Sequence, residues 1–222
     1  MLNIAIDGFS GAGKSTITGE IAKRLNIKRF DTGAIYRALA CEYLAQKLPQ
    51  PNEEVVEKFV KDIDVVVTFE NEIQHVIVNK HDWTSDLRKE EIGYFSSVIS
   101  PYPVLRQKVL TIQRHFASQN DCIMEGRDIG SVVLPHADVK FFLTASLEVR
   151  TIRRKEQLEK MGQTADYDEI YKNLKERDNH DLTREVAPLK KVEDAVEIDA
   201  SNLTIEQVVD KCIKIIEDKT KR

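Results

Sequence analysis

The sequence has few cysteines, no excess of positive charge and no long hydrophobic run, and each absence excludes a class of protein. Cys41, Cys122 and Cys212 form no Cys-x-x-Cys pair and no cysteine–histidine cluster with zinc spacing. We therefore expect buried thiols in a reducing compartment rather than a redox or metal site. The formal net charge of −4 argues against a general binder of nucleic acids or of membrane surfaces.

Hydrophobic runs are equally limited. No run approaches the ~18 apolar residues that a membrane span needs. The apolar run at residues 2–6 is cut at Asp7, which makes it too short for a signal peptide, and no basic region precedes it. A cytoplasmic protein is therefore expected. Nine glycines and six prolines in 222 residues give no disordered or fibrous signal, and this length allows one core with a sub-domain inserted into it.

Short apolar strands alternate with helical stretches along most of the chain. Residues 2–6 end in a glycine-rich turn, after which Ile17, Ile21 and Leu25 recur at helical spacing. This order predicts a strand, a loop and a helix.

The same order recurs later in the chain. Further strands are expected at residues 122–124, 139–143 and 195–199, and Thr204 with Gln207 forms a capping box at the start of the last helix. The alternation predicts an α/β fold in which a parallel sheet is covered by helices on both faces.

One segment interrupts the alternation. Residues 64–69 and 74–78 have the pattern of a β-hairpin joined across residues 70–72. We therefore expect a small inserted α+β sub-domain at residues 49–100. The core is expected to comprise residues 1–48 and 101–222.

A glycine-rich motif lies between the first predicted strand and helix. It matches G-x-x-x-x-G-K-[ST], the P-loop, whose glycines let backbone N–H groups converge on a phosphate chain at a helix N-terminus. Lys14 is expected to reach the β- and γ-phosphate oxygens, and the Ser15 hydroxyl to ligate magnesium. The predicted ATP-binding residues are Gly8, Phe9, Ser10, Gly11, Ala12, Gly13, Lys14, Ser15 and Thr16.

A P-loop alone does not distinguish hydrolysis from transfer to an acceptor. Transfer to an acceptor that is itself a phosphate needs a second cluster of cations, and arginine suits it because its planar fork binds phosphate oxygens in pairs. Four arginines lie in loops or at helix borders rather than along one solvated face: Arg37, Arg127, Arg177 and Arg184. Their placement favours a kinase with a phosphorylated acceptor.

Five ordered motifs resemble those of bacterial cytidylate kinases. They are the P-loop with its preceding aspartate, Asp-Thr-Gly-Ala-Ile-Tyr-Arg at residues 31–37, Glu-Gly-Arg-Asp-Ile-Gly at 125–130, Lys-Glu-Arg-Asp at 175–178 and Ala-Pro-Leu at 187–189. The resemblance runs from Leu2 to about Lys219, and the inserted hairpin is similar to the enlarged monophosphate-binding sub-domain of the bacterial enzymes.

The resemblance implies transfer of the γ-phosphoryl group of ATP to CMP and dCMP, which gives CDP or dCDP and ADP in pyrimidine nucleotide metabolism. It implies Mg²⁺ bound with ATP. No nucleic acid or membrane is expected as a partner, and a monomer is expected. It also implies roles for individual residues. Arg37, Arg127 and Arg184 would hold the acceptor phosphate near Thr32 and Tyr36; Ser97, Arg106 and Asp128 would read cytosine; Arg177 and Asp181 would hold the ribose; and Lys14, Arg127 and Arg184 would be catalytic.

Several alternatives stay open at this point. Arg153 and Arg154 would belong to a short helical lid at about residues 146–165 that closes over the ATP phosphates, or they could form a solvated helix face with Arg150 and Lys155. Ser96 could read the base instead of Ser97. Asp31 could hold magnesium through a water or cap the following helix.

Two rival functions remain. One is another P-loop small-molecule kinase, and the other is a nucleotide-gated switch that hydrolyses ATP slowly and transfers nothing.

Overall fold

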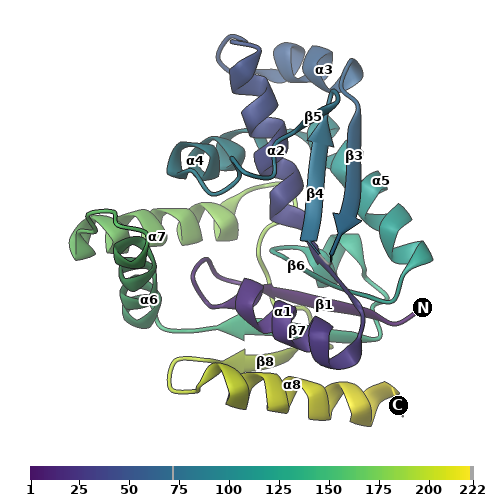
Figure 1. The fold of residues 1–222 in the computed structure, drawn as a ribbon, viewed down its shortest axis with the longest axis vertical. Helices are drawn as coiled ribbons and strands as arrows, with labels where there is room; N and C mark the ends of the chain where they lie inside the picture. The colour runs from purple at the N-terminus through teal and green to yellow at the C-terminus, as the bar shows by residue number, and fades with distance from the viewer. Residues whose placement is uncertain (72, 221–222) are drawn as a thin grey trace. The chain divides into compact units, whose positions relative to one another are not determined.

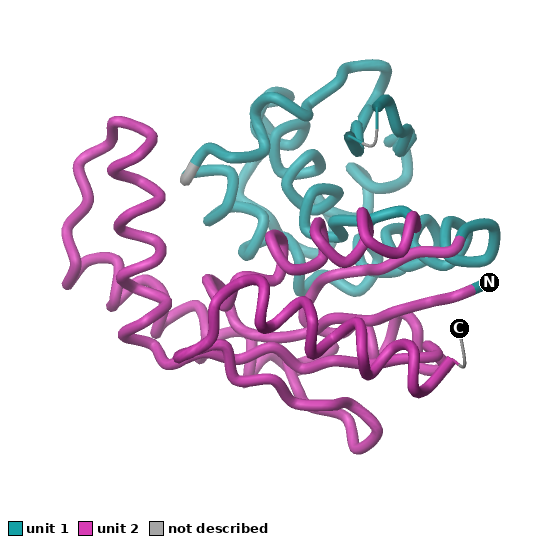
Figure 2. The backbone as a smooth tube through the Cα atoms, turned by 60° about the horizontal axis from the view of Figure 1, so that its bottom comes forward, with its two compact units in different colours: residues 1, 28–120 teal, residues 2–27, 121–222 magenta. Residues whose placement is uncertain are grey.

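The computed structural model describes residues 1–71 and 73–220, and its chain divides into two compact units (Figures 1 and 2). The first unit contains residues 28–120 together with Met1, and the second contains residues 2–27 and 121–222. The first unit is thus larger than the inserted segment expected at residues 49–100. The boundary of the monophosphate-binding sub-domain within it stays a prediction.

The second unit is built on parallel strands in the order β6-β1-β7-β8. The predicted α/β class with a parallel sheet is therefore confirmed. Because the strands are parallel and in register, their carboxyl ends and the loops that follow them lie at one edge of the sheet. The strands are β1 (Asn3–Gly8), β6 (Cys122–Gly126), β7 (Val139–Thr144) and β8 (Val196–Asp199).

Two helices, α1 (Lys14–Leu25) and α8 (Ile205–Thr220), pack with this sheet in one hydrophobic cluster. The cluster includes Ile4 and Ile6 of β1 together with the buried face of each helix. The predicted capping box is confirmed. The backbone N–H of Thr204 donates to the Gln207 side chain at 2.9 Å, and the backbone N–H of Gln207 donates to the Thr204 hydroxyl at 3.2 Å. The remaining cluster members include Ile17, Ile21, Ile123, Phe141, Leu143, Ile198, Val208, Val209, Cys212 and Ile216.

Two further helices of the second unit pack against each other. They are α6 (Leu147–Lys160) and α7 (Tyr167–Thr183), which share a small cluster formed by Leu158, Ile170 and Leu174. Each helix has a side-chain N-cap, from Ser146 and Asp166 respectively. A single π-helical turn, η1 (Ile129–Val133), follows β6.

The first unit combines helices with a small antiparallel sheet. Its strands run in the order β3-β4-β5, and β3 pairs with β4 as the predicted hairpin, which is confirmed. Glu72, in the predicted turn, lies outside the described residues. The elements are β2 (Lys28–Asp31), α2 (Thr32–Ala45), α3 (Glu53–Lys61), β3 (Val65–Glu70), β4 (Ile73–Val78), β5 (His81–Asp82), α4 (Glu90–Ile99) and α5 (Pro103–Gln119).

A buried carboxylate ties α2 to the segment after β4. Glu42 accepts hydrogen bonds from the Asn79 amide and the Trp83 indole, both at 3.0 Å. A buried carboxylate is tolerated when its oxygens are bonded in this way. Trp83 therefore has a structural role in this unit.

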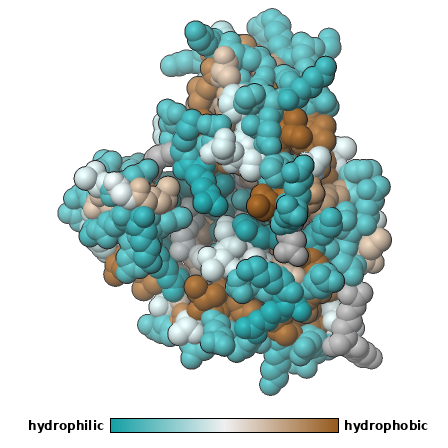
Figure 3. All heavy atoms as spheres, in the orientation of Figure 1, coloured by the Kyte–Doolittle hydropathy of each residue, from teal (hydrophilic) through white to brown (hydrophobic). Residues whose placement is uncertain are grey.

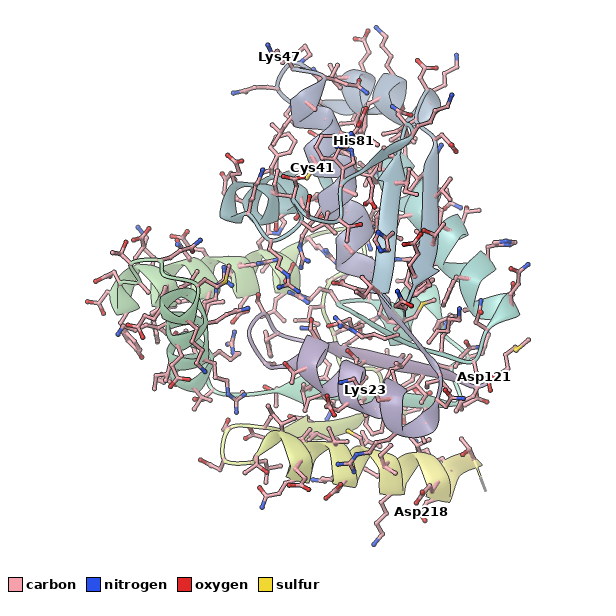
Figure 4. All side chains as sticks on the ribbon, viewed as in Figure 1. Lys23, Cys41, Lys47, His81, Asp121 and Asp218 are labelled. Carbon is pink, nitrogen blue, oxygen red and sulfur yellow. The ribbon has the colours of Figure 1, made fainter. Side chains whose placement is uncertain are left out.

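The three cysteines are buried and free, as the sequence predicted. Burial raises the pKa of Cys41, on α2 (Figure 4), to about 11. It also raises the pKa values of Cys122 and Cys212 to about 12. The thiols are therefore protonated at neutral pH and behave as small apolar groups.

The surface is mostly hydrophilic on the face drawn in Figure 3. Large exposed hydrophobic side chains, such as Tyr94 and Ile73, come from several different elements. Among the described residues, no helix combines the length and the apolar character that crossing a membrane requires.

The close approach of β1 to β7 makes a specific demand at Gly8. Its φ of +150° is one that L side chains rarely adopt, and a Cβ there would overlap the carbonyl oxygen of Leu143. We therefore expect Gly8→Ala to lower the free energy of unfolding by about 3 kcal/mol, measured by urea denaturation. Gly93→Ala is the control, because a Cβ on Gly93 would meet no described atom outside its own helix within 4 Å; in helix α4 it should stabilise by about 0.5–1 kcal/mol. Equal effects at both sites would contradict this explanation.

Candidate active site

The P-loop connects β1 to α1 in the second unit, as the sequence predicted. Gly13 precedes the helix with a φ of +94°, a conformation that favours glycine. Its carbonyl accepts the first helical hydrogen bonds, from Thr16 at 3.1 Å and Ile17 at 3.0 Å. The loop therefore ends at a helix N-terminus, where backbone N–H groups and the helix dipole favour an anion.

Lys14 is held inside this loop. Its ammonium donates to the carbonyls of Gly8 and Phe9 at 2.8 and 2.7 Å, and its side chain is buried. Burial and, next, the positive charge of Arg127 lower the pKa of Lys14 well below its usual value, although Glu125 opposes this. An anionic ligand at this position would stabilise the charged form of Lys14, because the ammonium is buried and lies in the field of another cation.

A carboxylate approaches the P-loop from the neighbouring strand. Glu125, at the end of β6, accepts a hydrogen bond from the Ser15 hydroxyl at 2.8 Å and another from Thr18 at 3.1 Å. Glu125 is 4% exposed. A hydroxyl and a carboxylate at this distance provide the hard oxygen ligands that Mg²⁺ prefers, so the donor set fits this metal.

Four charged side chains of alternating sign form the other part of the site in this unit. Arg127 pairs with Asp181 at 2.7 Å, and Arg184 lies 3.9 Å from the other carboxylate oxygen of Asp181. Arg184 also lies 3.7 Å from Asp128. The four residues come from the loop after β6 and from the end of α7, and all are largely buried. We call them the arginine–aspartate cluster.

The cluster has a clear electrostatic signature. Burial raises the pKa of Asp181, but the charge and hydrogen bond of Arg127 and the charges of Arg177 and Arg184 outweigh it, so the pKa lies below its usual value. Asp181 is therefore ionised at neutral pH. Ionised Asp181 lies against both the Arg127 and the Arg184 guanidinium groups and holds them in place before any phosphate arrives.

The Ala-Pro-Leu motif supports Arg184. The guanidinium of Arg184 donates through Nε to the carbonyl of Ala187 at 2.8 Å, and the N–H of Leu189 donates to the Asp181 carbonyl at 2.7 Å. Ala187 has a φ of +50° immediately before Pro188. This turn folds the chain back onto the end of α7 and restricts the arginine.

Asp7, which precedes the P-loop, is buried against η1. Its two carboxylate oxygens accept hydrogen bonds from the backbone N–H groups of Ile129 and Gly130, at 2.8 and 2.7 Å. Burial raises its pKa to about 6, although these bonds and the charge of Lys14 lower it. Asp7 thus fixes the turn that follows Arg127 and Asp128.

The first unit gathers a second group of the sequence-predicted residues. Asp31 caps α2 by accepting from Ala34 at 3.2 Å, which is one of the two sequence-based alternatives, and lies 3.7 Å from Arg37. The Arg106 guanidinium lies 5.7 Å from the centre of the Tyr36 ring. Thr32 is buried at the start of α2. A role for Asp31 in magnesium binding stays a prediction.

Both candidate serines lie on α4. Ser96 and Ser97 each donate to the carbonyl of Gly93, at 2.9 and 3.2 Å, and Ser96 is the more buried of the two. Arg106 bonds to the carbonyl of Ser100, just beyond this helix, at 3.2 Å. The base-reading role of Ser97 stays a prediction, with Ser96 as the alternative.

Of the α6 residues that could form a solvated face, Arg150 does not, so that alternative is wrong for this residue and stays open for Arg153 and Arg154. This residue is 4% exposed and pairs with Asp178 of α7 at 2.7 Å. Arg153 bonds to the carbonyl of Ala200 at 2.7 Å, and Arg154 to Gln157 at 2.9 Å. The lid role of Arg153 and Arg154 stays a prediction.

Comparison with known proteins decides the family. The family model described as "Cytidylate kinase" matches residues 4–218. The chain belongs to the cytidylate kinase family. It is 41% identical to a cytidylate kinase of Geobacillus sp. strain WCH70, with 98% of this chain and 97% of that protein covered. It is also 41% identical to a cytidylate kinase of Geobacter sulfurreducens, with 98% and 94% covered.

Solved structures agree on the fold. An uncharacterized protein from Eubacterium ventriosum is 14% identical to this cytidylate kinase family member, with a TM-score of 0.54 and 98% of each chain covered. This similarity concerns the fold alone.

The structure adds three residues that the motif-based prediction did not assign to the site: Glu125, Asp7 and Arg150. Glu125 and Asp7 lie inside the recognised motifs, at the ends of two apolar strands, so their position was a usable signal. Arg150 gave no such signal, because its helix is rich in charged residues and its burial depends on packing.

The raised pKa of Asp7 predicts a pH effect. Because its folded pKa of about 6 exceeds the usual 3.8, protonation favours the folded state, and this contribution is lost as the pH rises through 6. Asp7 should therefore lower the free energy of unfolding by about 2 kcal/mol between pH 4 and pH 7. In a ¹³C NMR titration its carboxyl should have a midpoint near 6, whereas Asp194, whose pKa is lowered by its bond with Lys140, should titrate at a lower pH than an ordinary aspartate. An Asp7 midpoint below 4 would refute the assignment.

Proposed function

We propose that this member of the cytidylate kinase family transfers the γ-phosphoryl group of ATP to CMP, and to dCMP, through the P-loop and the arginine–aspartate cluster. The observation that carries the proposal is that the P-loop and the Arg127–Asp128 part of the cluster follow adjacent parallel strands of one unit, β1 and β6, whose register pairs Asp7 with Gly126. Two sites for anions therefore follow the same edge of the sheet.

The acceptor phosphate requires no general base, because its oxygen is already anionic. Catalysis then consists of holding this oxygen in line with the γ-phosphate and compensating the charge of the two anions. Arg127 and Arg184 are assigned to the acceptor phosphate, and Arg37 to the same phosphate from α2. Since the two buried guanidinium groups are already fixed by aspartates, little reorganisation is needed when the phosphate binds.

Lys14 is assigned to the β- and γ-phosphates. Its lowered pKa rises again when phosphate oxygens replace the carbonyl contacts, because an opposite charge favours the ammonium. Gly8, Gly11 and Gly13 allow backbone N–H groups to surround the phosphates.

Magnesium is assigned to Ser15 and Glu125. The Ser15 hydroxyl donates a hydrogen bond to the Glu125 carboxylate. When bound, the ion neutralises charge on the β- and γ-phosphate oxygens. The hydrogen bond holds the Ser15 hydroxyl and one Glu125 oxygen 2.8 Å apart.

Base recognition is assigned to Asp128, Arg106 and Ser97. Cytosine presents an amino donor at N4 and acceptors at N3 and O2, whereas uracil presents an acceptor at O4 and a donor at N3. A carboxylate accepts a hydrogen bond from the N4 amino group of cytosine, whereas it repels the O4 oxygen of uracil. Arg177 and Asp181 are assigned to the ribose, although Asp181 also serves the cluster through Arg127.

A panel of acceptors tests the proposed function. ADP release from ATP is measured in a coupled assay with CMP, dCMP, UMP, AMP or dTMP. CMP and dCMP should give the highest kcat/KM. A preference for another acceptor would favour a different small-molecule kinase, and ADP release that no monophosphate changes would favour a switch protein.

Lys14→Ala is the matched loss-of-function variant in the same panel. It removes one charge at the phosphates and should lower kcat by on the order of 10² to 10³, while circular dichroism stays native. Lys23→Ala, on the exposed part of the same helix, should keep full activity. A Lys14→Ala enzyme with more than about a tenth of the activity would refute the P-loop assignment.

The base-reading role of Asp128 has its own test. Asp128→Ala should lower kcat/KM for CMP far more than for UMP, so that the CMP/UMP ratio falls by at least about 100-fold, because a site built for a polar partner rejects the wrong base by up to about 10⁴. Arg184→Ala is the control. It removes the cation next to Asp128, but it should lower kcat/KM for CMP and kcat/KM for UMP by the same factor. If Asp128→Ala also lowers both equally, its role is to position Arg184.

A further inference from the structure

One buried ion pair of the second unit has no part in the proposed chemistry. Arg150 on α6 and Asp178 on α7 lie 2.7 Å apart, and their side chains are 5% and 12% exposed. Asp178 belongs to the Lys-Glu-Arg-Asp motif, of which only Arg177 received a role from the sequence. A buried pair of this kind is weak evidence for stability alone, so the contacts on each side of it indicate its role.

Arg150 makes two contacts with the P-loop and lies close to a third position. Its Nη1 donates to the carbonyl of Ser10 at 3.0 Å, and its guanidinium carbon lies 5.1 Å from the centre of the Phe9 ring. A Cβ at Gly11 would lie 3.3 Å from the Cβ of Arg150. The bond to Ser10 matters for phosphate binding, because a carbonyl bonded to arginine cannot face the phosphate and repel it.

Asp178 connects the same arginine to the acceptor side. It lies on α7 one residue after Arg177 and three residues before Asp181, and the helix is followed directly by Arg184. Arg150 further donates through Nε to the carbonyl of Ala145 at 2.9 Å, which anchors the guanidinium to the end of β7. The planar fork of one arginine thus joins the P-loop, the sheet and α7.

We propose that the Arg150–Asp178 pair positions α7 relative to the P-loop, so that ATP bound at the P-loop raises the affinity of the enzyme for CMP. This inference rests on the proposed function, since it concerns communication between the two substrates. Phosphates that fix the P-loop backbone also fix the Ser10 carbonyl, and through Arg150 and Asp178 they fix the helix that carries the acceptor residues. The second substrate then binds to a site that is already ordered.

Calorimetry measures this coupling directly. The Kd for CMP is determined with and without a saturating non-hydrolysable ATP analogue and Mg²⁺. In the wild-type enzyme the analogue should tighten CMP binding at least about fivefold, within the usual range of coupling. In Asp178→Asn this ratio should fall below about two, because the charge that holds Arg150 is lost. Glu176→Gln, which changes an exposed carboxylate on the same helix, should keep the wild-type ratio.

A double variant separates positioning from simple stabilisation. Replacing a buried ion pair by apolar residues commonly preserves the fold, so Arg150→Met with Asp178→Leu should melt near the wild-type temperature. It lacks the bond to Ser10, so its ratio should also fall below two. A wild-type ratio near one, an unchanged ratio in Asp178→Asn, or a ratio restored in the double variant would each overturn the inference. If CMP is not phosphorylated at all, the proposed function fails first and the inference falls with it.

Discussion

The parallel register of β1 with β6 and β7 is the constraint on which the rest of the second unit depends. Asp7 pairs with Gly126 on one side and with Phe142 on the other. The P-loop, the Arg127–Asp128 turn and the start of α6 therefore all begin at the carboxyl edge of one sheet. Residues more than 100 positions apart in the chain, such as Ser15 and Glu125, come within hydrogen-bonding distance for this reason.

Charge is arranged at this edge so that each cation has a carboxylate or a carbonyl as a partner. Arg127 and Arg184 are held by aspartates, and Lys14 by carbonyls of its own loop. Buried charges without such partners would cost far more free energy than they return. The pairing also prepares the site for catalysis, because cations whose rotamers are already fixed lose little entropy when they bind phosphate.

Much of this arrangement could be predicted from the sequence, for identifiable reasons. The P-loop is a local pattern whose backbone geometry follows from its glycines, and the hairpin at β3 and β4 follows from its apolar strands, so both were predicted close to their observed positions. The capping box at Thr204 is local as well.

The contacts that escaped prediction are those between distant segments. Arg150 resembles its charged neighbours along α6 and is buried only because α7 and the P-loop pack around it. The raised pKa of Asp7 depends likewise on burial beneath η1. Neither effect leaves a pattern in the residues nearby, since each arises when the sheet assembles.

The burial of all three cysteines has a practical consequence for observing the enzyme at work. Thiols that are inaccessible and have raised pKa values react slowly with maleimide dyes. New cysteines at exposed positions, such as Lys23 on α1 and Lys58 on α3, would therefore accept fluorophores selectively without removal of the natural ones. Energy transfer between two such dyes would report the distance between the two labelled positions during each catalytic cycle.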